Sequence, residues 1–353
     1  MITIAGDIHL KTSTFCVLDE QGQRLARQKV LNDPDIIKSF IAGFPGKKQL
    51  SVEATYNWQV FYELLKNDVD EFHLLHPKKL QAIIQSQAKS DNADADMLAE
   101  LTWRGRLPEA YTSCAETRQF RHLLRARVKV AQQIASVKNQ VHALLNANIF
   151  YGQRPKNFKD LFCKRGLTYL QTVSLPNKDR FLVDQLLAEI QQLEKTKAQI
   201  QEYIEQAEFH TADIDLLSTV PGLKKSKLLK YIVASEIDQL SRFRNARALV
   251  AYAGLIPKEH SSGEKIRKGK LRTDSNTFLR WALIEASLGA ILGDKKLKAY
   301  YQEVKSRNNS SAARVACARK LLTVVYHVLK ERRPYYTVDQ QPATHCIPSI
   351  AVP

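Results

Sequence analysis

The chain has 353 residues and a formal net charge of +17, with 53 lysines and arginines against 36 acids. This length suits two or three domains, and the excess of positive charge favours a polyanion such as nucleic acid as the partner. No apolar run approaches the roughly 20 residues that cross a bilayer, which argues against a membrane protein. The N-terminus lacks the basic start of a signal peptide. The five scattered cysteines are typical of reduced thiols in a cytoplasm.

Short apolar runs alternate with amphipathic stretches in the first third of the chain. Such alternation predicts an α/β domain, which we place at residues 1–110. Its strands are expected at residues 2–8, 13–18, 24–30, 49–53 and 71–75. Its helices are expected at residues 35–43, 55–66 and 78–103.

Four acids in this domain suggest a common site. Asp7 and Glu53 each end an apolar strand, where open α/β sheets bind their ligands. Asp91 and Asp94 lie three residues apart and share one face of the expected helix. Each acid alone also fits an ordinary turn or a solvated helix N-terminus. Together they predict a site for two Mg²⁺ ions, with Mn²⁺ as the alternative, of the kind used in phosphodiester chemistry.

Two long helices are expected at residues 116–150 and 179–206, within a segment covering 111–210. The basic stretch between them, at 151–181, is interpreted as an irregular linker or insertion. The second helix has apolar residues at alternating steps of three and four, which is a heptad seam. Either the two helices pair as an antiparallel hairpin or they meet copies in a partner subunit. The seam positions are Val183, Leu186, Ile190, Leu193, Lys197, Ile200 and Ile204.

The last domain is expected at residues 211–336, followed by a disordered tail at 337–353. Near its start, Pro221-Gly222 is typical of a turn between helices that presents backbone amides to a phosphate strand. Further helices are expected at 225–236, 245–254, 278–292 and 312–330, with a hydroxyl-bearing turn among basic residues at 255–270. The residues expected to contact nucleic acid are Arg118, Arg121, Arg125, Lys129, Lys224, Lys225, Lys265, Arg267, Lys268 and Lys270.

Taken in order, these motifs resemble the DEDD transposases of the insertion sequence 110 family. The resemblance runs from about residue 3 to residue 336, with Lys224 and Ser275 standing where glycine is usual. It rests on Gly6-Asp7-Ile8-His9, Val52-Glu53-Ala54-Thr55, His76-Pro77-Lys78-Lys79, Lys89-Ser90-Asp91 with Asp94-Ala95, Gly105-Arg106-Leu107-Pro108, Val220-Pro221-Gly222, Gly254-Leu255-Ile256-Pro257 and Ser261-Ser262-Gly263.

The resemblance implies a RuvC-like RNase H fold for the first domain, a coiled-coil hairpin, and a mainly α-helical C-terminal transposase domain. It implies that the four acids hold Mg²⁺. It also implies that Ser262, or alternatively Ser261, attacks DNA and forms a phosphoserine link. The implied partners are the DNA ends and target, a noncoding bridge RNA as guide, and further copies of the chain as a dimer or a synaptic tetramer. The implied location is the bacterial cytoplasm, at the nucleoid.

Other functions compete with this one. A RuvC-like nuclease would cleave junctions with water, and the serine would then be structural. A basic remnant of a mobile element would bind nucleic acid without catalysis. An actin-like ATPase also begins with a strand-borne aspartate, but the sequence shows no glycine-rich phosphate loop.

Overall fold

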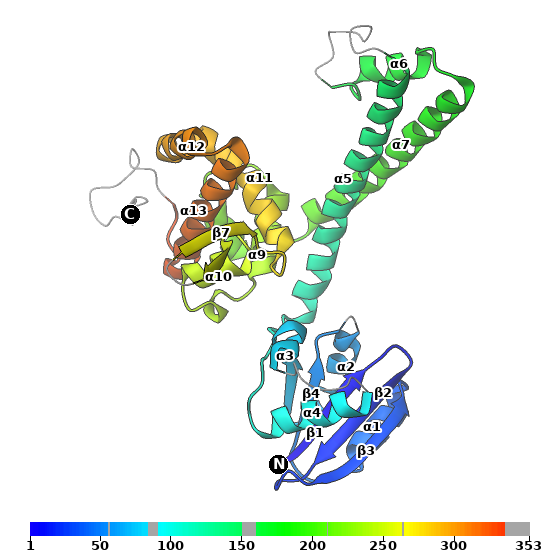
Figure 1. The fold of residues 1–353 in the computed structure, drawn as a ribbon, viewed down its shortest axis with the longest axis vertical. Helices are drawn as coiled ribbons and strands as arrows, with labels where there is room; N and C mark the ends of the chain where they lie inside the picture. Colours follow the sequence, from blue (N-terminus) through cyan, green and yellow to red (C-terminus); the bar gives the residue numbers. More distant parts are fainter. Residues whose placement is uncertain (56, 84–90, 150–159, 210, 263–264, 336–353) are drawn as a thin grey trace. The chain divides into compact units, whose positions relative to one another are not determined.

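The computed structural model describes the chain outside residues 56, 84–90, 150–159, 210, 263–264 and 336–353 (Figure 1). Side chains at 82–83, 91–93, 258–262, 265–268 and 270 also lie outside the description. The chain divides into two compact units, Met1–Ser113 and Cys114–Pro353. The long helices expected within 111–210 therefore share a unit with the C-terminal domain. Among the described residues, no helix is long and apolar enough to span a membrane.

The first unit is built on one mixed sheet of five strands, ordered β3-β2-β1-β4-β5. Strand β1 runs antiparallel to β2 and parallel to β4, and β4 runs parallel to β5. The expected α/β alternation is confirmed, and the strand bounds differ from the prediction by one residue at most. The strands are β1 (Ile2–Ile8), β2 (Thr12–Leu18), β3 (Arg24–Leu31), β4 (Lys48–Glu53) and β5 (Glu71–Leu75).

Helices cover both faces of this sheet (Figure 1). Alternate residues of a strand point to opposite faces, so Ile4 packs with helices α1 and α2, whereas Ala5 packs with α3 and α4. A continuous helix was expected at 78–103; the structure has α3 and α4 there, and residues 84–90 lie outside the description. The helices are α1 (Pro34–Ala42), α2 (Trp58–Leu65), α3 (Pro77–Ile83) and α4 (Asp91–Trp103).

Two long helices, α5 (Ala115–Asn148) and α7 (Asn177–Gln206), begin the second unit and pack antiparallel. The Asn148 amide donates to Asp179 over 3.0 Å at one end, and the Arg127 guanidinium donates to Gln201 over 3.0 Å at the other. The intramolecular hairpin is thus the arrangement that the structure contains. The seam residues Val183, Ile190 and Ile204 are buried, and a coiled coil stays a prediction.

The stretch at 151–181 was expected to be irregular, and this was wrong for its second half. Helix α6 (Lys164–Thr172) lies there, with Leu170 fully buried against α5 and α7. Gly166 allows the chain to turn tightly, because a Cβ atom at this position would lie 2.0 Å from the carbonyl oxygen of Leu161. The buried face of α6 holds this segment in place despite its basic composition.

The C-terminal part of the second unit is mainly α-helical and packs around α11 and α13. Several of its elements were not predicted: the short helix α8, the 3₁₀ turn, the lysine-rich helix α12, and a β-hairpin made of β6 and β7. Its helices are α8 (Thr211–Leu217), α9 (Lys227–Ile237), α10 (Ala246–Tyr252), α11 (Thr277–Gly293), α12 (Lys295–Arg307) and α13 (Ser310–Glu331), with a 3₁₀ turn at Leu240–Arg242. Its strands are β6 (Pro257–Ser262) and β7 (Lys265–Leu271).

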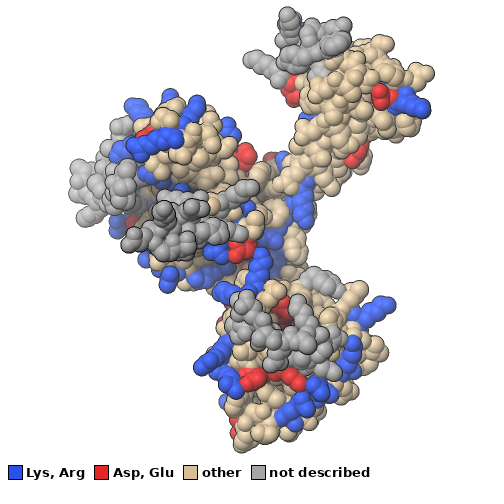
Figure 2. All heavy atoms as spheres, in the orientation of Figure 1, with Lys and Arg blue, Asp and Glu red and all other residues tan. Residues whose placement is uncertain are grey.

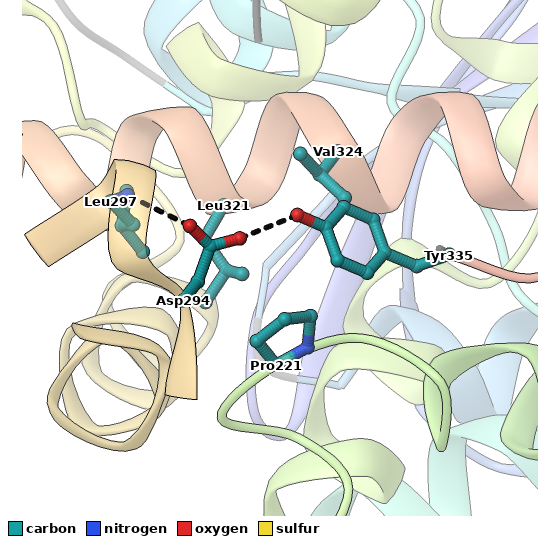
Figure 3. A pocket seen from close by; sticks show the side chains of 6 residues that line it. All are labelled: Pro221, Asp294, Leu297, Leu321, Val324 and Tyr335. Atoms are coloured by element: carbon teal, nitrogen blue, oxygen red, sulfur yellow. Dashed lines mark hydrogen bonds between the residues drawn. The ribbon is translucent and has the colours of Figure 1, made fainter. Parts of the chain in front are cut away.

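Tyr335 fastens the end of the described chain to this unit (Figure 3). Its hydroxyl donates to Asp294 over 2.6 Å, and its backbone N–H donates to the Thr219 hydroxyl over 2.8 Å. Asp294 also caps α12 by accepting from the N–H of Leu297 over 2.9 Å. Burial, and then the bond to Asp294, raise the pKa of Tyr335. The tail predicted at 337–353 lies outside the described residues.

Candidate acidic site and serine hairpin

Asp7 and Glu53 lie at the carboxyl ends of neighbouring parallel strands. Gly6 of β1 pairs with Val52 of β4, so each acid is the next residue on its own strand. Gly6 suits the packed side of β1, because a Cβ atom there would lie 2.8 Å from the ring of Phe15. Asp7 is 9% exposed and Glu53 is half-buried. The strand-end position expected for both acids is the one that the structure gives them.

The C-terminal end of α4 is held by the turn between β2 and β3, at the end of β1 that is opposite to Asp7. Trp103 donates from its indole N–H to the carbonyl of Glu20 over 3.2 Å, and its ring fills the space beside Gly22. This turn follows β2, whose Leu18 pairs with Thr3 near the start of β1. The N-terminal end of α4 therefore points toward the carboxyl end of β1.

This direction brings the two aspartates of α4 to the side of the sheet that carries Asp7. Ala95 and Leu98 of α4 are buried against that face. Asp91 comes four residues before Ala95, and Asp94 comes four residues before Leu98. Both aspartate positions therefore lie one turn earlier on the same side of the helix. Asp94 is half-buried, and the side chain of Asp91 lies outside the described residues. The helix thus places both positions at the carboxyl end of β1.

The third acid of this stretch, Asp96, has a different role. Its carboxylate accepts from Arg24 over 2.9 Å and from Arg27 over 2.8 Å, which ties α4 to β3. Burial, and then a hydrogen bond with Asp96, raise the pKa of the Cys16 thiol to about 12. Asp96 is therefore a structural acid that helps to fix the helix carrying Asp91 and Asp94.

The loop after β1 holds a histidine against Asp7. The His9 imidazole lies 3.2 Å from the Asp7 carboxylate. Two amide side chains fix this loop: Asn32 donates to the His9 carbonyl over 2.7 Å, and Asn57 donates to the same oxygen over 3.1 Å. His9 belongs to the motif Gly6-Asp7-Ile8-His9, and the sequence alone gave it no role. Its place two residues after Asp7 was the signal that could have suggested one, because residues two apart in extended backbone point to the same side.

Carboxylate oxygens are the donors that Mg²⁺ and Mn²⁺ prefer, so the donor chemistry at this end of the sheet fits the expected cation. Among the described side chains, no three of Asp, Glu, His or Cys lie close enough together to bind a metal ion. Asp91 lies outside that set. The two-metal site therefore stays a prediction.

The expected nucleophile lies in the second unit, at the end of a β-hairpin. Strand β6 ends at Ser262, which pairs with Lys265 of β7, and Ser261 pairs with Ile266. A turn was expected across this whole stretch, whereas Pro257–Ser262 form β6 and Lys265–Leu271 form β7. The side chains of both serines, and of the basic residues expected to contact nucleic acid on β7, lie outside the description.

The expected Pro-Gly turn lies between α8 and α9 and packs closely on α11. Gly222 has φ +82°, and a Cβ atom there would lie 1.9 Å from the carbonyl oxygen of Ala286. Only glycine fits this position. Lys224 and Lys225 follow the turn and are exposed, so their charges are open to a polyanion.

Two segments of the chain match models of known protein families. Residues 4–149 match a family model described as a transposase, of the IS110 DEDD type, and residues 214–302 match one described as the transposase IS116/IS110/IS902 family. Two segments of the chain are therefore similar to the domains of IS110-family transposases. The first matched segment includes the four acids, and the second includes both serines of the hairpin.

Relatives of known description agree with this family. A probable family 20 transposase of Pseudomonas aeruginosa is 22% identical over 267 residues, covering 74% of this chain and 78% of that protein. The transposase for insertion sequence element IS1111A of Coxiella burnetii is 21% identical over 275 residues, covering 74% of this chain and 72% of that protein. A pilin gene-inverting protein of Moraxella bovis is 34% identical over 125 residues, covering 34% of this chain but only 38% of that protein.

Three of the arginines expected to contact nucleic acid are buried or partly buried in the second unit. Glu236 is 1% exposed and accepts two hydrogen bonds from the Arg125 guanidinium, over 2.7 and 2.8 Å. Arg121 donates to the carbonyl of Ser235 over 3.2 Å, and Arg118 is buried. A buried carboxylate needs a partner, and Arg125 provides one for Glu236. The pattern of residues along α5 could not show this, because Glu236 lies far away in the sequence. Lys129 remains exposed, and lysine and arginine side chains lie on the visible face of both units (Figure 2).

Proposed function

We propose that this chain is a DNA transposase of an insertion sequence, which cleaves and exchanges DNA strands through a covalent phosphoserine–DNA intermediate. The observation that carries the proposal is the pair of family matches in one chain. One match covers the acids at the end of a sheet, and the other covers a hairpin that ends in serine. The net charge of +17 supports DNA as the substrate.

The described relatives support the same class of chemistry. Two of them are described as transposases and one as a protein that inverts a pilin gene. Moving a DNA segment and inverting one both require phosphodiester bonds to be broken and rejoined. An enzyme that keeps the bond as a protein–DNA ester can rejoin strands without an external source of energy.

In the proposed step, the Oγ atom of Ser262 attacks the scissile phosphorus and loses its proton. A bond between Oγ and phosphorus forms, the bond between phosphorus and the 3′-oxygen breaks, and that oxygen takes up a proton to become a free 3′-hydroxyl. Attack by a 3′-hydroxyl of another strand reverses the step and releases the serine. The basic residues Lys265 and Arg267 on β7 would neutralise phosphate charge during both steps.

The acids of the first unit would hold Mg²⁺, through Asp7, Glu53, Asp91 and Asp94. When bound, the cation polarises the phosphate and stabilises charge on the leaving oxygen. His9 lies against Asp7 and would keep its carboxylate oriented. The proposal requires the acids and Ser262 to meet at one phosphorus atom, either within one chain or between two chains of an oligomer.

A guide RNA is part of the proposal. Pairing between a noncoding bridge RNA and DNA would select the sequence, and the protein would then bind both through shape and phosphate contacts. The exposed Lys224 and Lys225 beside the Pro-Gly turn are suited to such contacts. A structured noncoding stretch beside the gene, complementary to the element ends and the target, would support this part of the proposal.

The test of the mechanism compares Ser262→Ala with Ser261→Ala, its neighbour on the same strand. Both are incubated with labelled DNA ends, Mg²⁺ and the flanking noncoding RNA, and covalent protein–DNA adducts are measured on denaturing gels. We expect Ser262→Ala to form no adduct and no joined product, and Ser261→Ala to form both.

Two results would favour the competing functions. Cleavage by Ser262→Ala with no adduct in the wild-type protein would indicate a nuclease that uses water. DNA binding by the wild-type protein with no Mg²⁺-dependent cleavage would indicate a non-catalytic remnant. If only Ser261→Ala loses the adduct, the nucleophile is the neighbouring serine and the reaction class stands.

A further inference from the structure

A buried threonine at the acidic site lacks a hydrogen-bond partner. Thr14, on β2, is 1% exposed, and its hydroxyl oxygen has no partner among the described residues. Leaving a buried polar group unpaired costs about 1–3 kcal/mol. Valine has the same shape, is equally suited to a strand, and would avoid that cost. The hydroxyl is therefore expected to have a partner that the described residues do not supply.

The register of the sheet places Thr14 beside Asp7. The two residues are direct cross-strand partners in the antiparallel pair of β1 and β2, and such partners lie on the same face of a sheet. That face also carries Ala5 and Cys16, which pack against α4. The unpaired hydroxyl thus lies next to the most buried of the described site acids, under the helix that brings Asp94 to the same edge.

Other buried hydroxyls on this face are satisfied within the protein. Thr3 accepts a hydrogen bond from the Gln49 amide over 2.8 Å, and Ser51 accepts one from the Thr102 hydroxyl over 2.6 Å. Thr3 and Thr14 occupy opposite ends of the same pair of strands. The hydroxyl without a described partner is the one at the end where the acids lie.

We propose that Thr14 is a positioning residue of the acidic site, and that its hydroxyl binds a water molecule carried by a hydrated divalent cation at Asp7. The inference rests on the proposed function, because it assumes that Asp7 holds such a cation. Mg²⁺ loses its waters reluctantly and keeps several when it binds to one or two carboxylates. In a site that is largely buried, those waters need acceptors, and the Thr14 hydroxyl supplies one.

The test uses the full chain and Mn²⁺ alone as the probe, with free Mn²⁺ measured by electron paramagnetic resonance. We expect Thr14→Val to weaken Mn²⁺ binding by about 10–100-fold, the usual effect of removing an outer-shell partner of a metal ligand. Thr14→Ser, which keeps the hydroxyl, restores most of the affinity. The Tm of Thr14→Val equals or exceeds that of the wild-type protein, because the variant removes an unpaired buried group.

Thr3→Val is the matched control on the same face. It removes a hydroxyl that has an internal partner, so we expect a lower Tm and unchanged Mn²⁺ binding. Unchanged Mn²⁺ binding in Thr14→Val would overturn the inference, as would a Tm loss in that variant like the loss in Thr3→Val.

Asp7→Asn separates failure of this inference from failure of the proposed function. If Asp7→Asn loses Mn²⁺ and Thr14→Val does not, the acidic site stands and the role of Thr14 falls. If Asp7→Asn binds Mn²⁺ as well as the wild-type protein, or the wild-type protein binds none, both ideas fall together.

Discussion

Asp7 in the first unit and Glu236 in the second are both buried carboxylates, and their surroundings differ. Glu236 is 1% exposed and is bound by Arg125 through two hydrogen bonds, with the Asn276 amide donating over 2.8 Å. Asp7 is 9% exposed, lies 3.2 Å from the His9 imidazole, and stands at the carboxyl end of β1 beside the Thr14 hydroxyl, for which the described part of the chain offers no partner. One carboxylate is neutralised by cations of its own chain, and the other stands where open sheets bind ligands.

The comparison teaches that burial alone does not mark a functional acid. What separates the two is the kind of partner that the chain provides. A guanidinium with two parallel hydrogen bonds satisfies a carboxylate and holds it fixed. Beside Asp7, by contrast, β2 carries the Thr14 hydroxyl, which has no hydrogen-bond partner among the described residues. Substitutions at the two carboxylates should therefore have opposite effects on stability and activity.

Glu236→Gln should cause the largest loss of stability. It leaves Arg125 without a counter-charge, and because the Arg125 side chain is 34% exposed, the loss should be smaller than the roughly 3–5 kcal/mol of a fully buried pair. We expect a lower free energy of unfolding in urea for the second unit. The first unit folds around its own core, and its unfolding should be unchanged. A variant as stable as the wild-type protein would show that the network is not structural.

Asp7→Asn should do the opposite. Strand cleavage with Mg²⁺ should fall by more than roughly 100-fold, since even an outer-shell partner of a metal ligand is worth about 10–100-fold. Stability should be unchanged or slightly higher, because a neutral amide is easier to bury than a charge. A cleavage assay and a thermal melt on the same sample measure both quantities. Full activity in this variant would exclude Asp7 from the site.

Exposed and internal cations should respond differently in DNA binding. Replacing Lys224 and Lys225 with Gln should weaken binding and reduce the slope of log K against log salt by about 0.9 for each phosphate that is no longer neutralised. Arg125→Lys keeps the charge but loses the paired hydrogen bonds to Glu236, so it should lower stability and leave the salt slope unchanged. Filter binding at several salt concentrations distinguishes the two. A reduced slope in Arg125→Lys would mean that Arg125 contacts DNA after all.

The buried thiols of Cys16 in the first unit and Cys317 in the second should make stability depend on pH. Burial raises the pKa of Cys16 to about 12, helped by Asp96, and raises that of Cys317 to about 11, both from 9.0. In the unfolded chain these thiols lose their protons above pH 9, whereas in the folded chain they keep them. Stability should therefore be complete below pH 9 and fall as the pH rises, by about 1.4 kcal/mol per pH unit for each thiol.

Urea unfolding of the wild-type protein, Cys16→Ala and Cys317→Ala at pH 8 and pH 10 measures this effect. Other groups that titrate in this range are common to the three proteins, so they cancel in the comparison. Each variant should lose less stability than the wild-type protein between the two pH values. Equal losses in all three would show that the thiols ionise alike in the folded and unfolded chains.

Much of the first unit was predictable because strands such as β1 and β2 are short, mostly apolar runs whose bounds are marked by turns. The acids at the strand ends followed from the same pattern, since Asp7 and Glu53 interrupt it at its close. Thr14 was not predictable as a site residue, because its importance depends on the register that pairs it with Asp7. That register is a property of the sheet and leaves no trace in the local sequence.

The second unit was harder to predict for other reasons. Strand β7 reads Lys-Ile-Arg-Lys-Gly-Lys-Leu, and its charges hide the alternation that usually reveals a strand. Helix α12 is rich in lysine and buries little beyond Leu297. The arginines of α5 were expected to contact nucleic acid. The sequence of one helix cannot show that Glu236, 111 residues away from Arg125, is hydrogen-bonded to it.

Helix α5 belongs to two hydrophobic cores at once. Leu124 and Val128 pack with the C-terminal helices, and Ile134 through Leu145 pack with α6 and α7. The helix has 34 residues and is about 50 Å long. Its length therefore sets the distance between the core around α6 and the core of the C-terminal helices. Seven residues added to both α5 and α7 would increase this distance by about 10 Å and would rotate the core around α6 by only about 20° about the helix axis. Two added residues would rotate the core around α6 by about 200°. Related chains that keep the same orientation of this core should therefore differ in the length of α5 and α7 by whole heptads.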